Sequence, residues 1–238
     1  MNDAGDRWRQ LTLGLFRDTG ASFENFHAAG NDEALRALAD WAAGQGPWCM
    51  LVWGGAGVGK SHLLQAAVRR AAERGVQTMY VPLAEARAYG AAALDGLEEL
   101  DALAVDDVDA LAGERDWEDA LFALYNRMQS AGRRLLVSAA TSPRELPLVL
   151  PDLKSRLAAA LVYRLVPLSD EDKRAALIAA AAARGIGMPE AIANYLLRRL
   201  PRDWSALHSA LEALDAASLS EGRSLTVPFV REVLKLED

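Results

Sequence analysis

The sequence predicts an α/β domain, a parallel five-stranded sheet with helices on both faces, followed by a small all-helical domain. Two observations carry this prediction. Short apolar runs alternate with amphipathic helical segments over the first two thirds of the chain, which is typical of a parallel sheet covered on both faces. After Pro167 only helical segments follow. We therefore expect a flexible tail over 1–21, the α/β domain over 22–167 and the helical domain over 168–238.

The elements of the α/β domain follow from hydrophobic periodicity. Apolar residues at helical spacing indicate amphipathic helices, and short apolar runs next to glycines indicate buried strands. Helices are expected at 31–43, 61–73, 83–93, 117–130 and 151–159. Strands are expected at 48–53, 76–83, 102–108, 134–139 and 161–166.

The second domain is predicted from four helical segments. They span 169–184, 189–200, 203–219 and 227–236. The first has a clear start, because Ser169 is a favourable N-cap and Asp172, three residues on, can complete a capping box. Gly185 is a favourable residue just past its end.

Composition limits the classes of function. The chain has 238 residues and a net charge of −7, which argues against a protein that coats DNA through a broad basic surface. Its longest wholly apolar run, 175–183, is far shorter than the roughly 20 residues of a membrane span. The N-terminus has no secretory pattern, and the single Cys49 cannot form an internal disulfide. We expect a cytoplasmic protein that does not associate with membranes.

Residues 54–61 match the phosphate-binding pattern G-x-x-x-x-G-K-[ST] at every fixed position. The match has the required context, a strand before it and a helix after it. Glycines let backbone N–H groups turn toward phosphates, the lysine reaches the β- and γ-phosphates, and the hydroxyl ligates Mg²⁺. The sequence therefore predicts binding of ADP or ATP with Mg²⁺. The predicted nucleotide-binding residues here are Gly54, Gly55, Ala56, Gly57, Val58, Gly59, Lys60, Ser61 and His62, with Ser61 also a metal ligand.

Acidic residues follow the expected third strand. Asp106, delivered by an apolar run, is predicted to hold Mg²⁺ largely through water, and Asp107 to orient the attacking water. At the end of the fourth strand, Ser138 or Thr141 can sense the γ-phosphate, although both also suit an ordinary turn.

Several stretches together resemble the AAA+ ATPases of the DnaA replication-initiator group. They are SFENF at 22–26, GGAGVGKSHLL at 54–64, VDDV at 105–108 and SRL at 155–157. Within that group, PLSDEDKR at 167–174 and LTVPFVREVLKL at 225–236 resemble the regulatory inactivators of DnaA, the Hda family. The resemblance implies an AAA+ base domain followed by a helical lid.

The resemblance also implies roles for individual residues. Arg156 matches the arginine finger that reaches a neighbour's nucleotide, and Arg202 the second sensor that touches the chain's own. Phe23, with Phe26 and Asn31, lies in the segment that lines the adenine site. On the residues alone, Arg156 can instead pair with Asp152, and Phe23 can be plain core. The fourth-strand segment lacks the aspartate that the family has near Ala140, which leaves that sensor unassigned.

The tail resembles the short peptide by which such proteins bind the DNA sliding clamp. An extended peptide places alternate apolar side chains in a pocket. The predicted partner-binding residues are Gln10, Leu11, Leu13, Leu15 and Phe16. Gly14 departs from the pattern and adds flexibility, and the alternative is a strand that packs on its own domain.

The function that the resemblance implies is negative regulation of chromosomal replication initiation. The nucleotide-bound chain docks on the DNA-loaded clamp and promotes hydrolysis of ATP bound to DnaA through Arg156, with slow or no turnover of its own nucleotide. Its partners are then the clamp and DnaA, and DNA only through the clamp; self-association is left open. The alternatives are an AAA+ loader of the replicative helicase and a P-loop small-molecule kinase, for which the sequence offers no acceptor base.

Overall fold

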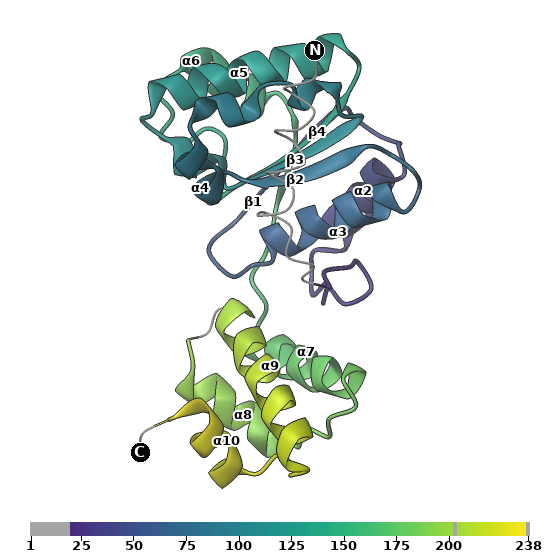
Figure 1. Ribbon diagram of the computed structural model, residues 1–238, viewed down its shortest axis with the longest axis vertical. Helices are drawn as coiled ribbons and strands as arrows, with labels where there is room; N and C mark the ends of the chain where they lie inside the picture. Colours follow the sequence, from purple (N-terminus) through teal and green to yellow (C-terminus); the bar gives the residue numbers. More distant parts are fainter. Residues whose placement is uncertain (1–19, 202–203, 237–238) are drawn as a thin grey trace. The chain divides into compact units, whose positions relative to one another are not determined.

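The computed structural model describes residues 20–201 and 204–236 and divides the chain into two compact units (Figure 1). Among the described residues, the sheet unit contains 20–55 and Gly59–Leu165. The helical unit contains Ala56–Val58, 166–201 and 204–236. Within the described ranges, no helix is both long and apolar enough to cross a membrane.

The sheet unit is built on five parallel strands in the order β2-β3-β4-β1-β5. The strands are β1 (Cys49–Trp53), β2 (Thr78–Pro82), β3 (Ala102–Asp106), β4 (Arg134–Ala139) and β5 (Leu161–Arg164). The central strands are almost wholly buried, while β5 lies at an edge and is partly exposed. This arrangement confirms the predicted fold class, and it brings the carboxyl ends of β1, β3 and β4 to one edge of the sheet.

Helices cover both faces of the sheet (Figure 1). On one face lie α2 (Asp32–Ala42) and α3 (Lys60–Ala72), and on the other lie α4 (Leu83–Ala86), α5 (Arg115–Ser130) and α6 (Pro151–Ala158). Successive side chains of a strand point to opposite faces of the sheet, so every second residue points toward α5. On that face, Leu51, Val105 and Val137 pack with Leu121 and Leu124 of α5.

One predicted helix is wrong. The expected helix over 83–93 is reduced to the single turn α4, followed by the 3₁₀ turns η1 (Arg87–Tyr89) and η2 (Ala91–Leu94). Gly90 separates those turns with a φ of +76°, a backbone conformation that a helix cannot include. Two further 3₁₀ turns, η3 (Leu97–Glu99) and η4 (Val108–Leu111), flank β3. Apolar spacing alone did not reveal the interruption, because Leu83, Ala86 and Leu94 are buried nonetheless.

The helical unit consists of α7 (Asp170–Ala183), α8 (Glu190–Arg199), α9 (Trp204–Glu221) and α10 (Val227–Leu234). Its core is formed by side chains from all four helices, among them Leu177, Leu196, Leu211 and Phe229. The predicted capping box at its start is confirmed. The Ser169 hydroxyl accepts the Asp172 N–H at 3.0 Å, and the Asp172 carboxylate accepts the Ser169 N–H at 3.3 Å.

A buried carboxylate on α5 fixes the segment that leads into α6. Glu118 is fully buried and accepts three backbone N–H groups, from Gly113 at 2.9 Å, Val149 at 3.1 Å and Leu150 at 2.7 Å. Leu150 is the N-cap of α6. Glu118 therefore sets where α6 begins, and with it the position of the side chains that α6 carries.

We expect Glu118→Ala to lower the free energy of unfolding by about 3 kcal/mol, because it leaves these three N–H groups without an acceptor. Denaturant unfolding of the purified chain measures the change. Asp116→Ala, which removes an exposed carboxylate from the same helix, is the matched control and is expected to change stability by less than about 0.5 kcal/mol. Equal stabilities for the two variants would contradict this account of Glu118.

Candidate nucleotide-binding site

The loop that joins β1 to α3 holds the phosphate-binding pattern at the carboxyl edge of the sheet. Its last residue, Gly59, is the N-cap of α3 and has a φ of +96°. A Cβ at this position would lie 2.5 Å from Cε2 of Phe26, which is too close for a side chain. Glycine is therefore required here both by the positive φ and by the space that the Phe26 ring occupies. The positive N-terminal end of α3 therefore lies at the end of the loop, where anions bind favourably.

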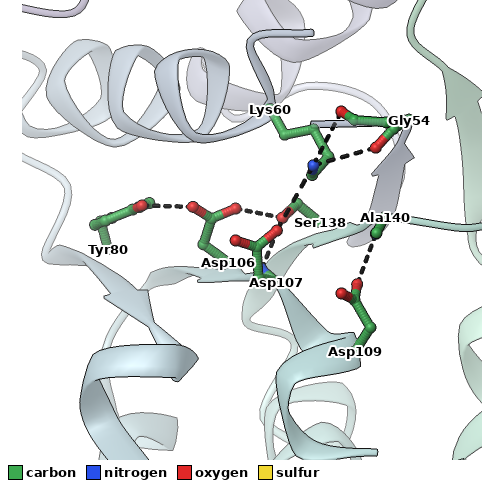
Figure 2. A network of polar contacts seen from close by, with 9 residues as sticks. Gly54, Lys60, Tyr80, Asp106, Asp107, Asp109, Ser138 and Ala140 are labelled. Atoms are coloured by element: carbon green, nitrogen blue, oxygen red, sulfur yellow. Dashed lines mark hydrogen bonds and ion pairs between the residues drawn. The ribbon is translucent and has the colours of Figure 1, made fainter. Parts of the chain in front are cut away.

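Lys60 lies at the centre of this edge (Figure 2). Its side chain is largely buried, and Nζ donates hydrogen bonds to the carbonyl oxygens of Gly54 at 3.1 Å and Gly55 at 3.4 Å. Nζ also lies 3.7 Å from Oδ1 of Asp107. The ammonium group thus joins the loop after β1 to the acid after β3, and it can offer its donors to phosphate oxygens.

The two predicted acids occupy different environments. Asp106 ends β3 and is only 2% exposed. Its Oδ2 accepts the Tyr80 hydroxyl at 2.5 Å, and its Oδ1 accepts the Ser138 hydroxyl (Figure 2). Asp107 is half-exposed and has a φ of +54°, which ends the strand earlier than the sequence predicted. Its N–H donates to Oγ of Ser138 at 2.8 Å, so one serine contacts both acids.

Burial and neighbouring charges shift the pKa values of Asp107 and Tyr80. Burial, followed by the neighbouring Asp106 carboxylate, raises the pKa of Asp107, while Lys60 acts in the opposite direction. A raised pKa makes Asp107 a better proton acceptor for a bound water. Burial and Asp106 also raise the pKa of Tyr80 far above its ordinary value. The Tyr80 phenol is therefore protonated at physiological pH and acts as a donor to Asp106.

The oxygen donors at this edge fit Mg²⁺ bound together with a nucleotide. Mg²⁺ takes oxygen ligands and is usually held by one or two protein groups, water and substrate phosphates. Ser61 lies in the first turn of α3, directly after Lys60, and Asp106 ends β3. The Ser61 hydroxyl and the Asp106 carboxylate are therefore the oxygen donors at this edge that can contribute to holding the ion.

The segment before α2 packs against the helix that follows the loop. Nε2 of His62 lies 2.8 Å from the Ser22 carbonyl oxygen, and the His62 ring lies 5.5 Å from that of Phe26. Phe23 is buried, with the Arg70 guanidinium 5.1 Å from its ring centroid. Of the two phenylalanines, Phe26 is the one whose ring lies against Gly59. The structure therefore places His62 and Phe26 beside the loop and Phe23 in the adjoining core.

The two candidate sensor residues at the end of β4 differ in burial. Ser138 is fully buried between Asp106 and Asp107, whereas Thr141 is exposed. At the intervening position, the Ala140 N–H donates to Oδ1 of Asp109 at 2.6 Å (Figure 2). Sequence reasoning missed Tyr80. Tyr80 and Asp106 lie on different strands, and only the register of β2 with β3 places both side chains on the same side of the sheet.

Arg156 lies apart from this network, on the exposed side of α6. Its carbonyl oxygen accepts the Tyr125 hydroxyl at 3.4 Å. Its guanidinium makes no ion pair with Asp152, nor with any other carboxylate in the part of the chain that the structure describes. The remaining predicted site residues lie outside the described residues: Arg202, Gln10, Leu11, Leu13, Leu15 and Phe16.

Comparison with known proteins identifies the family. The family model of the bacterial DnaA ATPase domain matches residues 18–164, and that of the Hda lid domain matches residues 170–234. Domain III of DnaA from Thermotoga maritima is 24% identical, with a TM-score of 0.76, over 92% of this chain and 97% of that chain. AMPPCP-bound DnaA from Aquifex aeolicus is 21% identical, with a TM-score of 0.70, over 87% of this chain and 68% of that chain.

A RuvB variant from Thermotoga maritima is similar in fold alone, at 15% identity and a TM-score of 0.65, over 90% of this chain and 71% of that chain. At such identities the solved structures establish the fold, while the family models establish the relationship. The chain therefore belongs to the bacterial DnaA ATPase-domain family, as a DnaA/Hda-like AAA+ protein with an Hda-type lid domain.

Proposed function

We propose that this chain is a negative regulator of replication initiation that promotes hydrolysis of ATP bound to DnaA. The proposal rests chiefly on the Arg156 side chain, which is exposed and forms no ion pair with a carboxylate among the described residues. It is also held on a helix whose start is fixed by Glu118. A free guanidinium on such a helix can stabilise charge on a phosphoryl group transferred in another molecule.

The chain's own nucleotide, ATP or ADP, binds at the loop after β1 in this proposal. Lys60 donates to its phosphates, and Ser61 and Asp106 hold Mg²⁺, which neutralises phosphate charge. Asp107 orients a water. Binding of AMPPCP by a DnaA of the same fold supports an adenine nucleotide at this loop. Turnover of that nucleotide is slow or absent in this proposal.

Docking on the DNA-loaded sliding clamp is assigned to residues 10–16. Leu11, Leu13 and Leu15 alternate with other residues, so an extended peptide presents them on one side. The chain's net charge of −7 is consistent with contact to DNA made through the clamp. The proposal thus combines a tethering peptide with an arginine that acts on the partner's nucleotide.

Deletion of residues 1–15 is expected to abolish binding to the clamp while leaving nucleotide binding intact. In the full chain, changing Leu13 and Leu15 together to Ala is expected to weaken clamp binding about 100-fold or more, because two buried leucines contribute about 1.5–3 kcal/mol each. Binding to immobilised, DNA-loaded clamp measures both.

Thr19→Ala is the matched control, since Thr19 lies outside the predicted clamp-binding peptide. The replicative helicase serves as a second immobilised partner. Undiminished clamp binding after the deletion rules out the docking assignment. Binding to helicase in place of clamp would support the loader alternative instead.

A further inference from the structure

Both carboxylate oxygens of Asp106 are held by neutral hydroxyl groups from the neighbouring strands. Tyr80 on β2 donates to Oδ2 at 2.5 Å, and Ser138 on β4 donates to Oδ1 (Figure 2). All three residues are buried, and within the described residues no cation forms an ion pair with Asp106. The orientation of this acid therefore depends on two hydroxyl donors.

The pairing of the strands explains how Tyr80 reaches Asp106. In the parallel register, Tyr80 lies opposite Ala104 and Pro82 lies opposite Asp106. Tyr80 and Asp106 consequently face the same side of the sheet, two positions apart, and the long phenol spans that offset. The phenol thus fixes one oxygen of the acid to which metal binding is assigned.

We infer that Tyr80 is a positioning residue of the nucleotide site, which orients the Asp106 carboxylate toward the metal position. The inference rests on the proposed binding of Mg²⁺ with the nucleotide. Hydrogen bonds to metal-binding carboxylates typically contribute 10- to 100-fold to metal affinity. Without the phenol hydroxyl, the buried Oδ2 lacks its donor, and Ser138 alone holds the carboxylate through Oδ1.

The test compares nucleotide affinity with and without the metal. AMPPCP binding to the full chain is measured by titration calorimetry in Mg²⁺ and in EDTA. For the wild-type chain we expect tighter binding in Mg²⁺. We expect Tyr80→Phe to reduce that Mg²⁺-dependent gain about 10-fold or more and to leave the affinity in EDTA within about twofold.

Tyr195→Phe is the matched control, because this buried α8 hydroxyl has no hydrogen-bond partner in the described part of the chain. It should leave both affinities unchanged. In an Asp106→Ala background, Tyr80→Phe should have no further effect on the Mg²⁺ dependence if the phenol acts through Asp106.

The possible results are distinguishable. Wild-type binding that does not respond to Mg²⁺ refutes the proposed metal site, and the inference with it. A wild-type response that Tyr80→Phe retains in full overturns the inference alone. An equal loss of affinity in Mg²⁺ and in EDTA also overturns it, because that result indicates general damage to the loop or the fold.

Discussion

Replacing Arg156 with Ala is expected to reduce the stimulated hydrolysis of DnaA-bound ATP about 10³-fold, the lower end of what arginine fingers contribute. The guanidinium is exposed on α6, and its charge is not neutralised by a carboxylate of the described residues. It would stabilise the charge that develops on the transferring phosphoryl group of the partner's ATP. The measurement is the single-turnover rate of hydrolysis in the presence of DNA-loaded clamp.

Two further variants separate charge from geometry. Arg156→Lys keeps the charge but loses the planar fork of donors, so we expect it to recover only part of the rate. Arg144→Ala removes another exposed arginine of the sheet unit and is expected to act like the wild-type chain. The finger assignment fails if Arg156→Ala stimulates hydrolysis as well as Arg144→Ala does.

Lys60→Ala is expected to weaken binding of ADP or ATP to this chain about 100-fold or more. Its ammonium donates to the Gly54 and Gly55 carbonyl oxygens and lies near Asp107, so it is already placed at the loop. Charge-assisted hydrogen bonds contribute about 1.5–3 kcal/mol each, and the loss of two corresponds to at least about 100-fold in affinity. Equilibrium titration with a fluorescent nucleotide measures the change.

Lys154→Ala provides the matched control for the loss of a lysine, since Lys154 lies on α6 across the sheet from α3. We expect it to bind nucleotide as the wild-type chain does. Tight nucleotide binding by Lys60→Ala would mean that the loop after β1 is not the nucleotide site.

The parts of the fold that depend on local pattern are predictable from the sequence. The glycine spacing of 54–61 predicts a strand, a loop and a helix, and β1 and α3 lie on either side of that loop. The Ser169 capping box is likewise a local signal and is present. The segment 83–93 shows the limit, because buried apolar side chains at helical spacing can also be supplied by separate short turns around Gly90.

The contacts of the site depend on tertiary arrangement, which the sequence pattern does not specify. The β2-β3-β4 order places Tyr80 and Ser138 on either side of Asp106, and no spacing along the chain encodes that order. The left-handed backbone of Asp107 is similarly fixed by its hydrogen bond to Ser138. The sequence thus predicts the acids, the lysine and Ser138, but neither Tyr80 nor the hydrogen bonds by which the two hydroxyl groups hold Asp106.

The central claim, that this chain promotes hydrolysis of ATP held by DnaA, is tested most directly by an omission assay. DnaA loaded with radiolabelled ATP is followed through a single turnover while the chain, the clamp and the DNA are left out in turn. The account predicts rapid conversion to ADP only when all three accompany DnaA. Conversion at the same rate without the chain, or without the clamp, would contradict it.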